Sequence, residues 1–137
     1  MKHEKLLPFW LYPSAYTQKE AIMLTVSDLM TFNPKTVTPM TPADRNSAFD
    51  AGRGCRHLPV VENGRLIGII TDRDLRAVVN TPVFASLVRP KTVMTSNPVT
   101  VSPGTPAHRA AEMLNLYKFN SLPVVDHGVL VGIVTSS

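Results

Sequence analysis

The residues best suited to chemistry lie where an apolar run gives way to polar residues, in the stretch Gly68-Ile69-Ile70-Thr71-Asp72-Arg73-Asp74-Leu75. Thr71 and Asp74 are three positions apart, which suits a helix cap: Thr71 binds backbone N–H groups and Asp74 favours the helix dipole. The same side chains can accept hydrogen bonds from a sugar diol at a strand-to-helix junction. Arg73 and the free N–H groups of the helix start can then hold a phosphate. Both interpretations remain open from the spacing alone.

Other residue types that often carry chemistry form no recognisable set. Cys55 and His57 are two positions apart, so neither a helix nor a strand places them well for a nucleophile and its base. Cys55 is predicted to be a small, buried or half-buried residue. The four histidines (His3, His57, His108 and His127) show no metal-ligand spacing. We therefore predict no catalytic residues, no metal site and no catalytic cofactor.

Composition places the chain among folded, globular proteins. It has 137 residues, of which 44% are apolar and 18% charged. A single cysteine excludes an intramolecular disulfide and fits a reducing, cytoplasmic compartment. No apolar run approaches the roughly 18 residues of a membrane span. Residues 1–22 begin with lysines and a short apolar run that Pro8 interrupts, which argues against a signal peptide.

Charge is unevenly distributed along the chain. The net charge of +4 is modest for a dedicated nucleic-acid binder. Six arginines nevertheless lie within 32 residues of the first half: Arg45, Arg53, Arg56, Arg65, Arg73 and Arg76. They form either a solvated basic face or a site for a compact anion such as a phosphate.

The chain consists of two copies of one unit. Residues 26–73 align with residues 90–137 without insertion or deletion, and 20 of the 48 aligned positions are identical. Eight of the 12 prolines are matched pairs at the same spacing of 64 positions: 34 and 98, 39 and 103, 42 and 106, 59 and 123. We therefore predict two similar folded repeats related by a pseudo-two-fold axis.

Each copy has the same predicted order of elements, namely strand, helix, strand, strand and helix. A short extended segment between prolines comes first, and Thr41 or Thr105 then caps a helix with proline at its first position. In copy 2 that helix carries an apolar stripe predicted to face the core: Ala110, Met113, Leu114 and Tyr117. The corresponding helix of copy 1 contains Gly52 and Gly54 and is predicted to be short, displaced or mobile.

Two apolar strands follow in each copy. In copy 1 they span residues 58–61 and 66–70 around an Asn-Gly hairpin turn, and a second helix begins near Thr71. Because both runs are almost continuously apolar, both faces of these strands are predicted to be covered. Residues 80–92 link the copies.

These repeated motifs resemble a tandem cystathionine-β-synthase (CBS) domain pair, also called a Bateman module. The matching residues in copy 1 are Val26-Ser27-Asp28-Leu29-Met30-Thr31, Asn33-Pro34, Thr36-Val37, Leu58-Pro59-Val60-Val61, Gly64, Gly68-Ile69-Ile70-Thr71 and Asp74-Leu75. In copy 2 they are Val93-Met94-Thr95, Asn97-Pro98, Thr100-Val101, Leu122-Pro123-Val124-Val125 and Gly132-Ile133-Val134-Thr135. The resemblance covers about 24–137.

The resemblance implies an α+β fold (α/β-like), with the two repeats packed by pseudo-two-fold symmetry. It divides the chain into a leader of unknown role (1–23), repeat 1 (24–79), a linker (80–92) and repeat 2 (93–137). Repeat 2 ends before its last helix and before a residue matching Asp74. That departure predicts an exposed apolar surface favouring a homodimer or a swapped element.

The resemblance also implies adenine-nucleotide binding between the repeats. Carried over residue by residue, it assigns ribose to Thr71 and Asp74, adenine to Thr36, Val37, His57 and Pro59, and phosphate to Arg56 and Arg73. A second, weaker site is implied at Thr100, Val101, Asn120, Pro123 and Thr135.

The functional expectation is a non-catalytic regulatory module that binds AMP, ADP, ATP or an S-adenosylmethionine-like compound. Binding is expected to change conformation or oligomeric state, which an unknown regulated protein reads. One alternative is a structural dimerisation module with a decayed ligand site. A lesser alternative is nucleic-acid binding through the arginines of repeat 1, which would depend on salt.

Overall fold

The structure is a computed structural model and describes residues 23–40, 57–71, 73–74 and 89–136. Predictions for the leader, for the first helix of repeat 1, for Cys55 and Arg56, and for residues 75–88 lie outside these ranges. The chain divides into two compact units. Unit 1 comprises residues up to Phe32 with 99–126 and 131–137, and unit 2 comprises residues 33–98 with 127–130.

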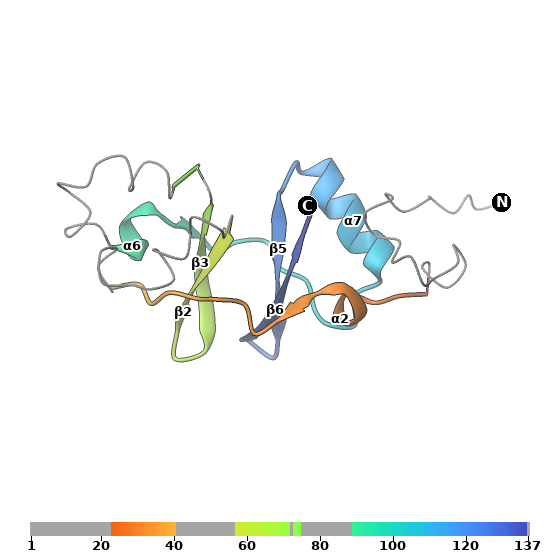
Figure 1. The fold of residues 1–137 in the computed structure, drawn as a ribbon, viewed down its shortest axis with the longest axis horizontal. Helices are drawn as coiled ribbons and strands as arrows, with labels where there is room; N and C mark the ends of the chain where they lie inside the picture. Colours follow the sequence, from red (N-terminus) through yellow and green to blue (C-terminus); the bar gives the residue numbers. More distant parts are fainter. Residues whose placement is uncertain (1–22, 41–56, 72, 75–88, 137) are drawn as a thin grey trace. The chain divides into compact units, whose positions relative to one another are not determined.

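Within the described residues, unit 1 contains two helices and three strands (Figure 1). They are α2 (Val26–Leu29), β1 (Thr31–Phe32), α7 (Ala107–Leu116), β5 (Ser121–Asp126) and β6 (Val129–Thr135), of which residues 129 and 130 are grouped with unit 2. β5 pairs with β6, and β1 adds to β6 in antiparallel register with Thr31 opposite Ile133. The mixed α+β content agrees with the predicted fold class.

Helix α7 follows the predicted apolar periodicity with two corrections. Thr105 does not cap it: the N-cap is Pro106, which is held extended (ψ 138°) by a bridge to Thr25. The helix therefore begins one residue later than predicted. Tyr117 is also wrong as a core residue, because the helix ends before it and its side chain is 55% exposed.

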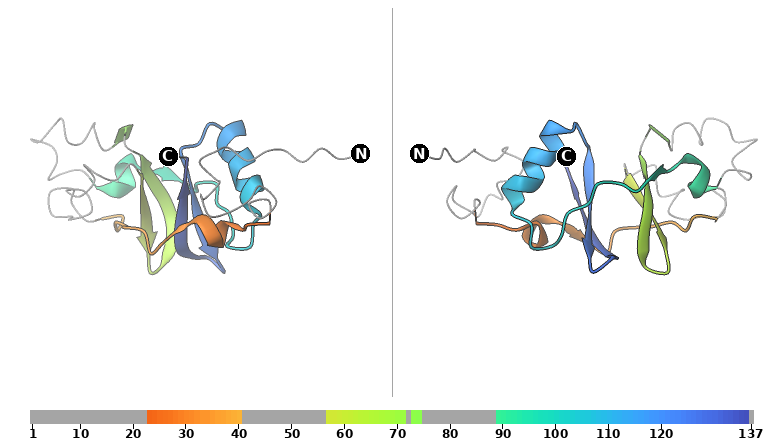
Figure 2. Two further views of the ribbon diagram at one scale, coloured as in Figure 1. Left: turned by 45° about the vertical axis from the view of Figure 1, so that its right-hand side comes forward. Right: turned by 180° about the vertical axis from the view of Figure 1, so that it is seen from behind.

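Unit 2 is built around a hairpin of β2 (His57–Glu62) and β3 (Arg65–Thr71), with α6 (Pro90–Val93) and β4 (Thr95–Ser96). The predicted Asn-Gly turn is confirmed, with φ of 54° at Asn63 and 81° at Gly64. The antiparallel register places His57 opposite Thr71, and β4 pairs with β3. Figure 2 shows α6 beside this hairpin.

The compact units do not follow the sequence repeats. The lead-in segment of repeat 1, which is the stretch at its start that contains α2 and β1, folds with the strands of repeat 2. The lead-in segment of repeat 2, which is the stretch around its start that contains α6 and β4, folds with the strands of repeat 1. The one-turn helices α2 and α6 were not anticipated from the sequence.

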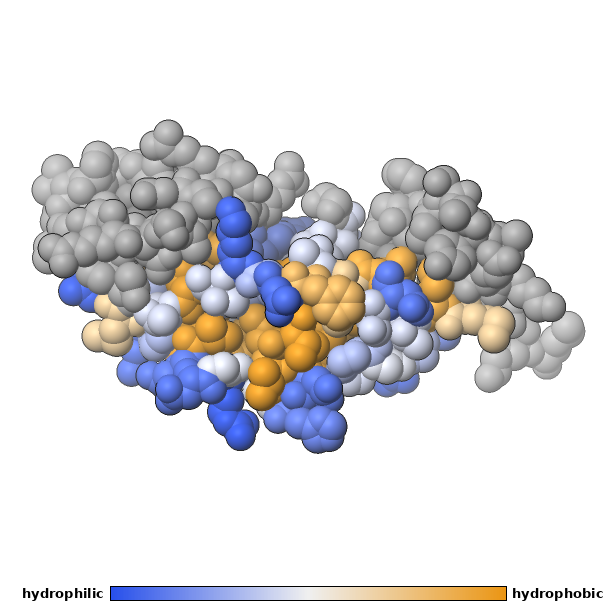
Figure 3. All heavy atoms as spheres, turned by 60° about the horizontal axis from the view of Figure 1, so that its bottom comes forward, coloured by the Kyte–Doolittle hydropathy of each residue, from blue (hydrophilic) through white to orange (hydrophobic). Residues whose placement is uncertain are grey.

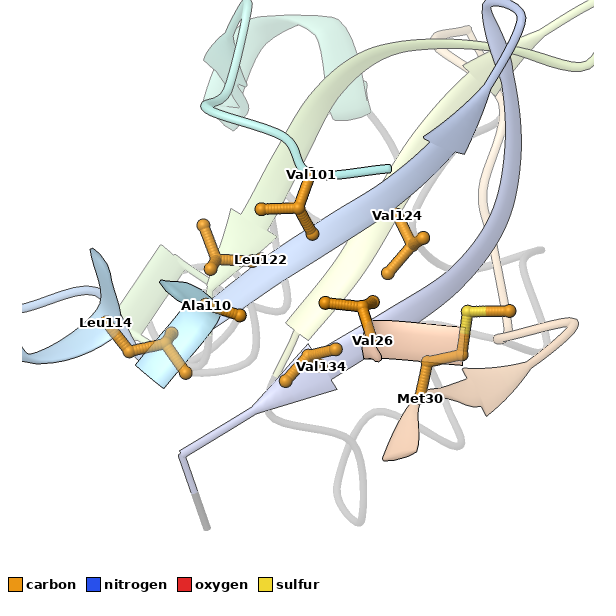
Figure 4. Packing of buried hydrophobic residues seen from close by; sticks show 8 residues of the cluster. All are labelled: Val26, Met30, Val101, Ala110, Leu114, Leu122, Val124 and Val134. Atoms are coloured by element: carbon orange, nitrogen blue, oxygen red, sulfur yellow. The ribbon is translucent and has the colours of Figure 1, made fainter. Parts of the chain in front are cut away.

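Each unit has an apolar core on its strands, which agrees with the predicted coverage of both faces. β2 and β5 have the same pattern of burial, as do β3 and β6. In unit 1 the cluster comes from α2 and its C-cap, from the bridge at Val101, and from α7, β5 and β6 (Figure 4). Its members are Val26, Met30, Val101, Ala110, Leu114, Leu122, Val124 and Val134. In unit 2, Leu58, Val60 and Ile70 are fully buried.

Some large apolar side chains remain exposed among the described residues: Met23, Phe32, Met40, Val99, Leu116, Tyr117 and Val129. Figure 3 shows a face of the molecule on which apolar residues reach the surface between hydrophilic ones. No helix in the described ranges is both long enough and apolar enough to span a membrane.

Candidate functional site

Thr71 and Asp74 form a hydrogen-bonded pair at the end of β3. The Thr71 backbone N–H and hydroxyl both donate to Asp74 Oδ2, at 3.0 Å each, and the Asp74 N–H lies 3.4 Å from Thr71 Oγ1. Both residues are half-buried. Among the described residues, no hydrogen bond reaches the other carboxylate oxygen, Oδ1. The pair thus has the hydrogen bonding of a helix cap, and within the described residues Oδ1 of Asp74 is open to a further hydrogen bond.

The same cap occurs where no ligand site was predicted. At the start of α2, the Thr25 N–H and hydroxyl donate to Asp28 Oδ2 at 2.8 and 3.1 Å. The Thr-x-x-Asp spacing therefore indicates a helix start in both places. What distinguishes Thr71 and Asp74 is their neighbourhood at the end of a buried strand.

The residues next to Thr71 and Asp74 are on β2. Thr71 lies opposite His57 in the antiparallel register, and directly opposite residues point to the same face. Because side chains alternate along a strand, Pro59 lies on the same face as His57. His57 is half-buried, and Pro59 is fully buried.

The Thr36–Val37 segment lies along β2 in the same unit. Val37 donates its N–H to Pro59 O at 3.0 Å and accepts from Val61 N–H at 2.9 Å, forming a single parallel bridge to Val60. Since its N–H is used and its side chain is only 2% exposed, Val37 has only a carbonyl lone pair left for a ligand. Thr36 is half-buried and makes no hydrogen bond among the described residues.

Unit 2 therefore brings together all the residues assigned to the first site that the structure describes. Arg73, the phosphate candidate next to the cap, is exposed. Arg56, the other candidate, lies outside the described ranges. No group of three or more histidine, cysteine, aspartate or glutamate residues suited to a metal occurs within those ranges.

Comparison with known proteins identifies the repeated unit. The family model described as the CBS domain matches residues 26–81 and again residues 91–137. The chain belongs to the CBS domain family. The match covers both repeats and includes every residue assigned to the first site.

Curated relatives carry the CBS domain in proteins of different length. A CBS domain-containing protein of Dictyostelium discoideum is 39% identical over 92 residues, which are 58% of this chain and 63% of the relative. CBS domain-containing protein YhcV of Bacillus subtilis is 30% identical over 82% of this chain and 80% of its own length. By contrast, the chain spans only 20% of inosine-5'-monophosphate dehydrogenase of Korarchaeum cryptofilum, at 32% identity over 74% of this chain.

Solved CBS-pair structures share the fold. CBSX2, solved in complex with AMP, has a TM-score of 0.70 at 32% identity, over 82% of this chain and 90% of that one. The CBS pair of protein MJ0100, solved with 5'-methylthioadenosine and S-adenosyl-L-methionine, has a TM-score of 0.67 at 26% identity, over 83% and 90% of the two chains.

The second CBS repeat places its site residues in unit 1 in the same way. Val101 donates its N–H to Pro123 O at 3.1 Å and accepts from Val125 N–H at 2.9 Å, as Val37 does in unit 2. After Thr135, however, Ser136 donates its N–H and hydroxyl to Asn120 O at 3.0 and 3.3 Å. Asn120 stands where the first repeat has Arg56, so repeat 2 has an amide in place of that cation.

Two features of the CBS pair escaped the sequence interpretation. The Thr25–Asp28 cap was not singled out, although its spacing is the one noted at Thr71. The close contacts of Met30 and Met94 with strand glycines were also not expected. The sequence did contain a signal for these contacts. Met30 and Met94 are separated by the repeat spacing of 64 positions, and so are Gly68 and Gly132.

Proposed function

We propose that the chain is a non-catalytic regulatory module that binds an adenine nucleotide or an adenosyl compound in unit 2. The observation that carries the proposal is the grouping of Thr36, His57, Thr71 and Asp74 around the ends of β2 and β3. Two structural relatives support the ligand class, because their structures contain AMP and S-adenosyl-L-methionine respectively.

Each residue has a distinct role in this proposal. Asp74 Oδ1 accepts a hydrogen bond from a ribose hydroxyl, while Oδ2 stays bonded to Thr71. Thr36 contacts the adenine edge, and Val37 serves mainly to fix Thr36 against β2. His57 packs on the ligand from the same face as Thr71, and Pro59 supports that face from within the core. Arg73 and Arg56 bind phosphate when the ligand carries one.

Regulation follows if the ligand prefers one conformation or oligomeric state of the chain. A ligand shifts such an equilibrium only by its difference in affinity for the two states. The output is then a change in conformation or in homodimerisation that a regulated protein recognises. The weaker second site, at Thr100, Val101, Asn120, Pro123 and Thr135, contributes less because it has Asn120 in place of Arg56.

A thermal-shift panel tests the proposal. AMP, ADP, ATP and S-adenosylmethionine are each added at millimolar concentration, and at least one is expected to raise the melting temperature by mass action. Asp74→Ala is expected to abolish this ligand-dependent rise. If no ligand changes the melting temperature of the unmodified chain, the proposed function is wrong.

Asp28→Ala is the matched control for the loss of the cap. Each variant removes a carboxylate that accepts hydrogen bonds from the backbone N–H and the hydroxyl of the threonine three residues before it, and each is expected to cost about 0.5–1.5 kcal/mol of stability. Only Asp74→Ala is expected to lose the ligand response. Equal ligand responses in the two variants would show that Asp74 acts solely as a helix cap.

A structural dimerisation module is the second candidate. It is favoured by the exposed apolar end of α7, where Leu116 is 72% exposed and Tyr117 stacks on Phe119 with ring centroids 5.4 Å apart. On this alternative the chain dimerises without nucleotide and Asp74→Ala does not affect assembly. Sedimentation of both forms, with and without AMP, separates the two candidates.

A further inference from the structure

A methionine packs into a space left by a strand glycine in each unit. In unit 1, a β-carbon placed on Gly132 would lie 2.5 Å from Met30 Sδ and 2.9 Å from Thr31 O. In unit 2, a β-carbon on Gly68 would overlap Met94 Sδ and lie 3.0 Å from Thr95 O. Only glycine therefore lets the thioether and the backbone of β1 or β4 approach the strand this closely.

These contacts fix the two lead-in segments, which contain β1 and β4, against their strands. Met30 is 8% exposed and belongs to the core cluster of unit 1. Directly after it, Thr31 and Phe32 pair with Ile133 and Gly132. The N-terminal side of the segment is fixed as well, because Val26 N–H donates to Thr105 O at 2.8 Å and Leu24 O accepts from Ala107 N–H at 2.8 Å.

The same segment then enters unit 2 within a few residues. Phe32 ends the first of the segments that make up unit 1, and Val37 already bridges β2 of unit 2. The connection has little freedom, since Asn33 adopts a positive φ of 47° and Pro34 has its φ fixed by its ring. Thr36 is thus four residues from a strand anchored in the other unit.

We propose that Met30 and Gly132 are positioning residues for Thr36 and Val37, although they lie in a different unit from the ligand site. The effect passes along the backbone of residues 30–37 and needs no particular arrangement of the two units. If Met30 loosens from Gly132, β1 is released, and the short link through Asn33 and Pro34 transmits that release to the Val37 bridge. Ligand binding in unit 2 and docking of β1 in unit 1 then stabilise one another.

The second repeat provides an internal replicate. Met94 contacts Gly68 in unit 2. From Met94 the chain continues through Asn97, with φ of 50°, and Pro98 to the Val101 bridge in unit 1. The influence of Met94 is therefore expected to run in the opposite direction, from unit 2 to unit 1.

Amide hydrogen exchange tests the inference without any ligand. In Met30→Ala, the N–H groups of Val37 and Val61 are expected to exchange at least about tenfold faster, a factor within the usual range of coupling between sites. The other amides of β2 and β3 are expected to change little. Gly104→Ala is the control, because the space around that glycine is open and no effect is expected.

Met94→Ala gives a second reading if Met30→Ala fails to fold, since Met94 is only half-buried. It is expected to accelerate exchange at Val101 and Val125 in unit 1. The inference is overturned if either variant accelerates exchange only within the unit that carries the substitution. Uniform acceleration throughout the other unit overturns it too, because that pattern reports a loss of global stability.

A binding experiment extends the test and rests on the proposed function. The Kd for AMP is expected to rise about tenfold in Met30→Ala and to be unchanged in Gly104→Ala. If AMP and the other adenine ligands do not bind the unmodified chain, the proposed function fails while the exchange data still decide this inference. If AMP binds Met30→Ala with unchanged Kd, the positioning role is refuted.

Discussion

The two repeats have similar interiors but different surfaces. β2 and β5 bury corresponding positions, and Leu58 and Leu122 are both completely buried. Outside the core, repeat 1 has Lys35 and Arg65 where repeat 2 has Val99 and Val129, each 45% exposed. The shared pattern of burial explains why the two interiors are alike, whereas at these two surface positions repeat 1 has a cation and repeat 2 an apolar residue.

The largest predicted effect tests whether the interiors are equivalent. Leu58→Ala and Leu122→Ala are each expected to cost about 2–5 kcal/mol of unfolding free energy, because each removes a fully buried side chain and leaves a cavity. Chemical denaturation measures both values. If the two unfolding free energies fall by amounts that differ by more than about 2 kcal/mol, the interiors are not equivalent. One core then collapses around the cavity more easily than the other.

A smaller effect is expected at the two hairpin turns. Gly64→Ala and Gly128→Ala are each predicted to cost about 1–2 kcal/mol, because both glycines have a positive φ, 81° and 84°, that L-residues adopt poorly. The new methyl at Gly128 must also displace Arg65 Nη1, 2.5 Å away, whereas the one at Gly64 meets nothing.

Arg65→Ala separates these two contributions. In that background the two glycine variants are expected to cost the same, as measured by thermal or chemical denaturation. A difference that persists would mean that the turns differ in their backbones and not only in the neighbouring side chain.

The smallest predicted effect concerns the apolar surface of repeat 2. Tyr117→Ser is expected to cost about 0.5–1 kcal/mol, because the exposed ring gives up little beyond its stacking on Phe119. Unfolding at two protein concentrations checks this value. A larger cost that increases with concentration would indicate that a second copy covers Tyr117, and it would favour the dimerisation candidate.

Strong local signals made most of the fold predictable. The Asn63-Gly64 turn, the apolar strands on either side and the apolar stripe of α7 up to Leu114 all depend on neighbouring residues, and the structure contains each of them. The helix start was missed by one residue because Pro106 is held by Thr25, far away in the sequence. Tyr117 was misjudged because it falls just after the end of the helix.

The residues of the candidate site could be selected from the sequence, and their role stays a prediction, whereas their hydrogen bonding could not be foreseen. The resemblance selected Thr36, Val37, Thr71 and Asp74, and the structure brings them into one unit. That the N–H of Val37 is already bound to Pro59 could not be foreseen, because a single bridge between distant segments leaves no periodic pattern. The exchange of lead-in segments between the units depends on tertiary packing in the same way.

The exchanged segments have a consequence for the chain cut into single repeats. An isolated repeat keeps its lead-in segment but lacks the strands on which that segment packs, and its own strand glycine lacks the covering methionine. A second molecule can supply the missing segment, so an isolated repeat is expected to pair with another copy of itself. In the full chain both segments belong to one molecule, at a constant spacing of 64 residues.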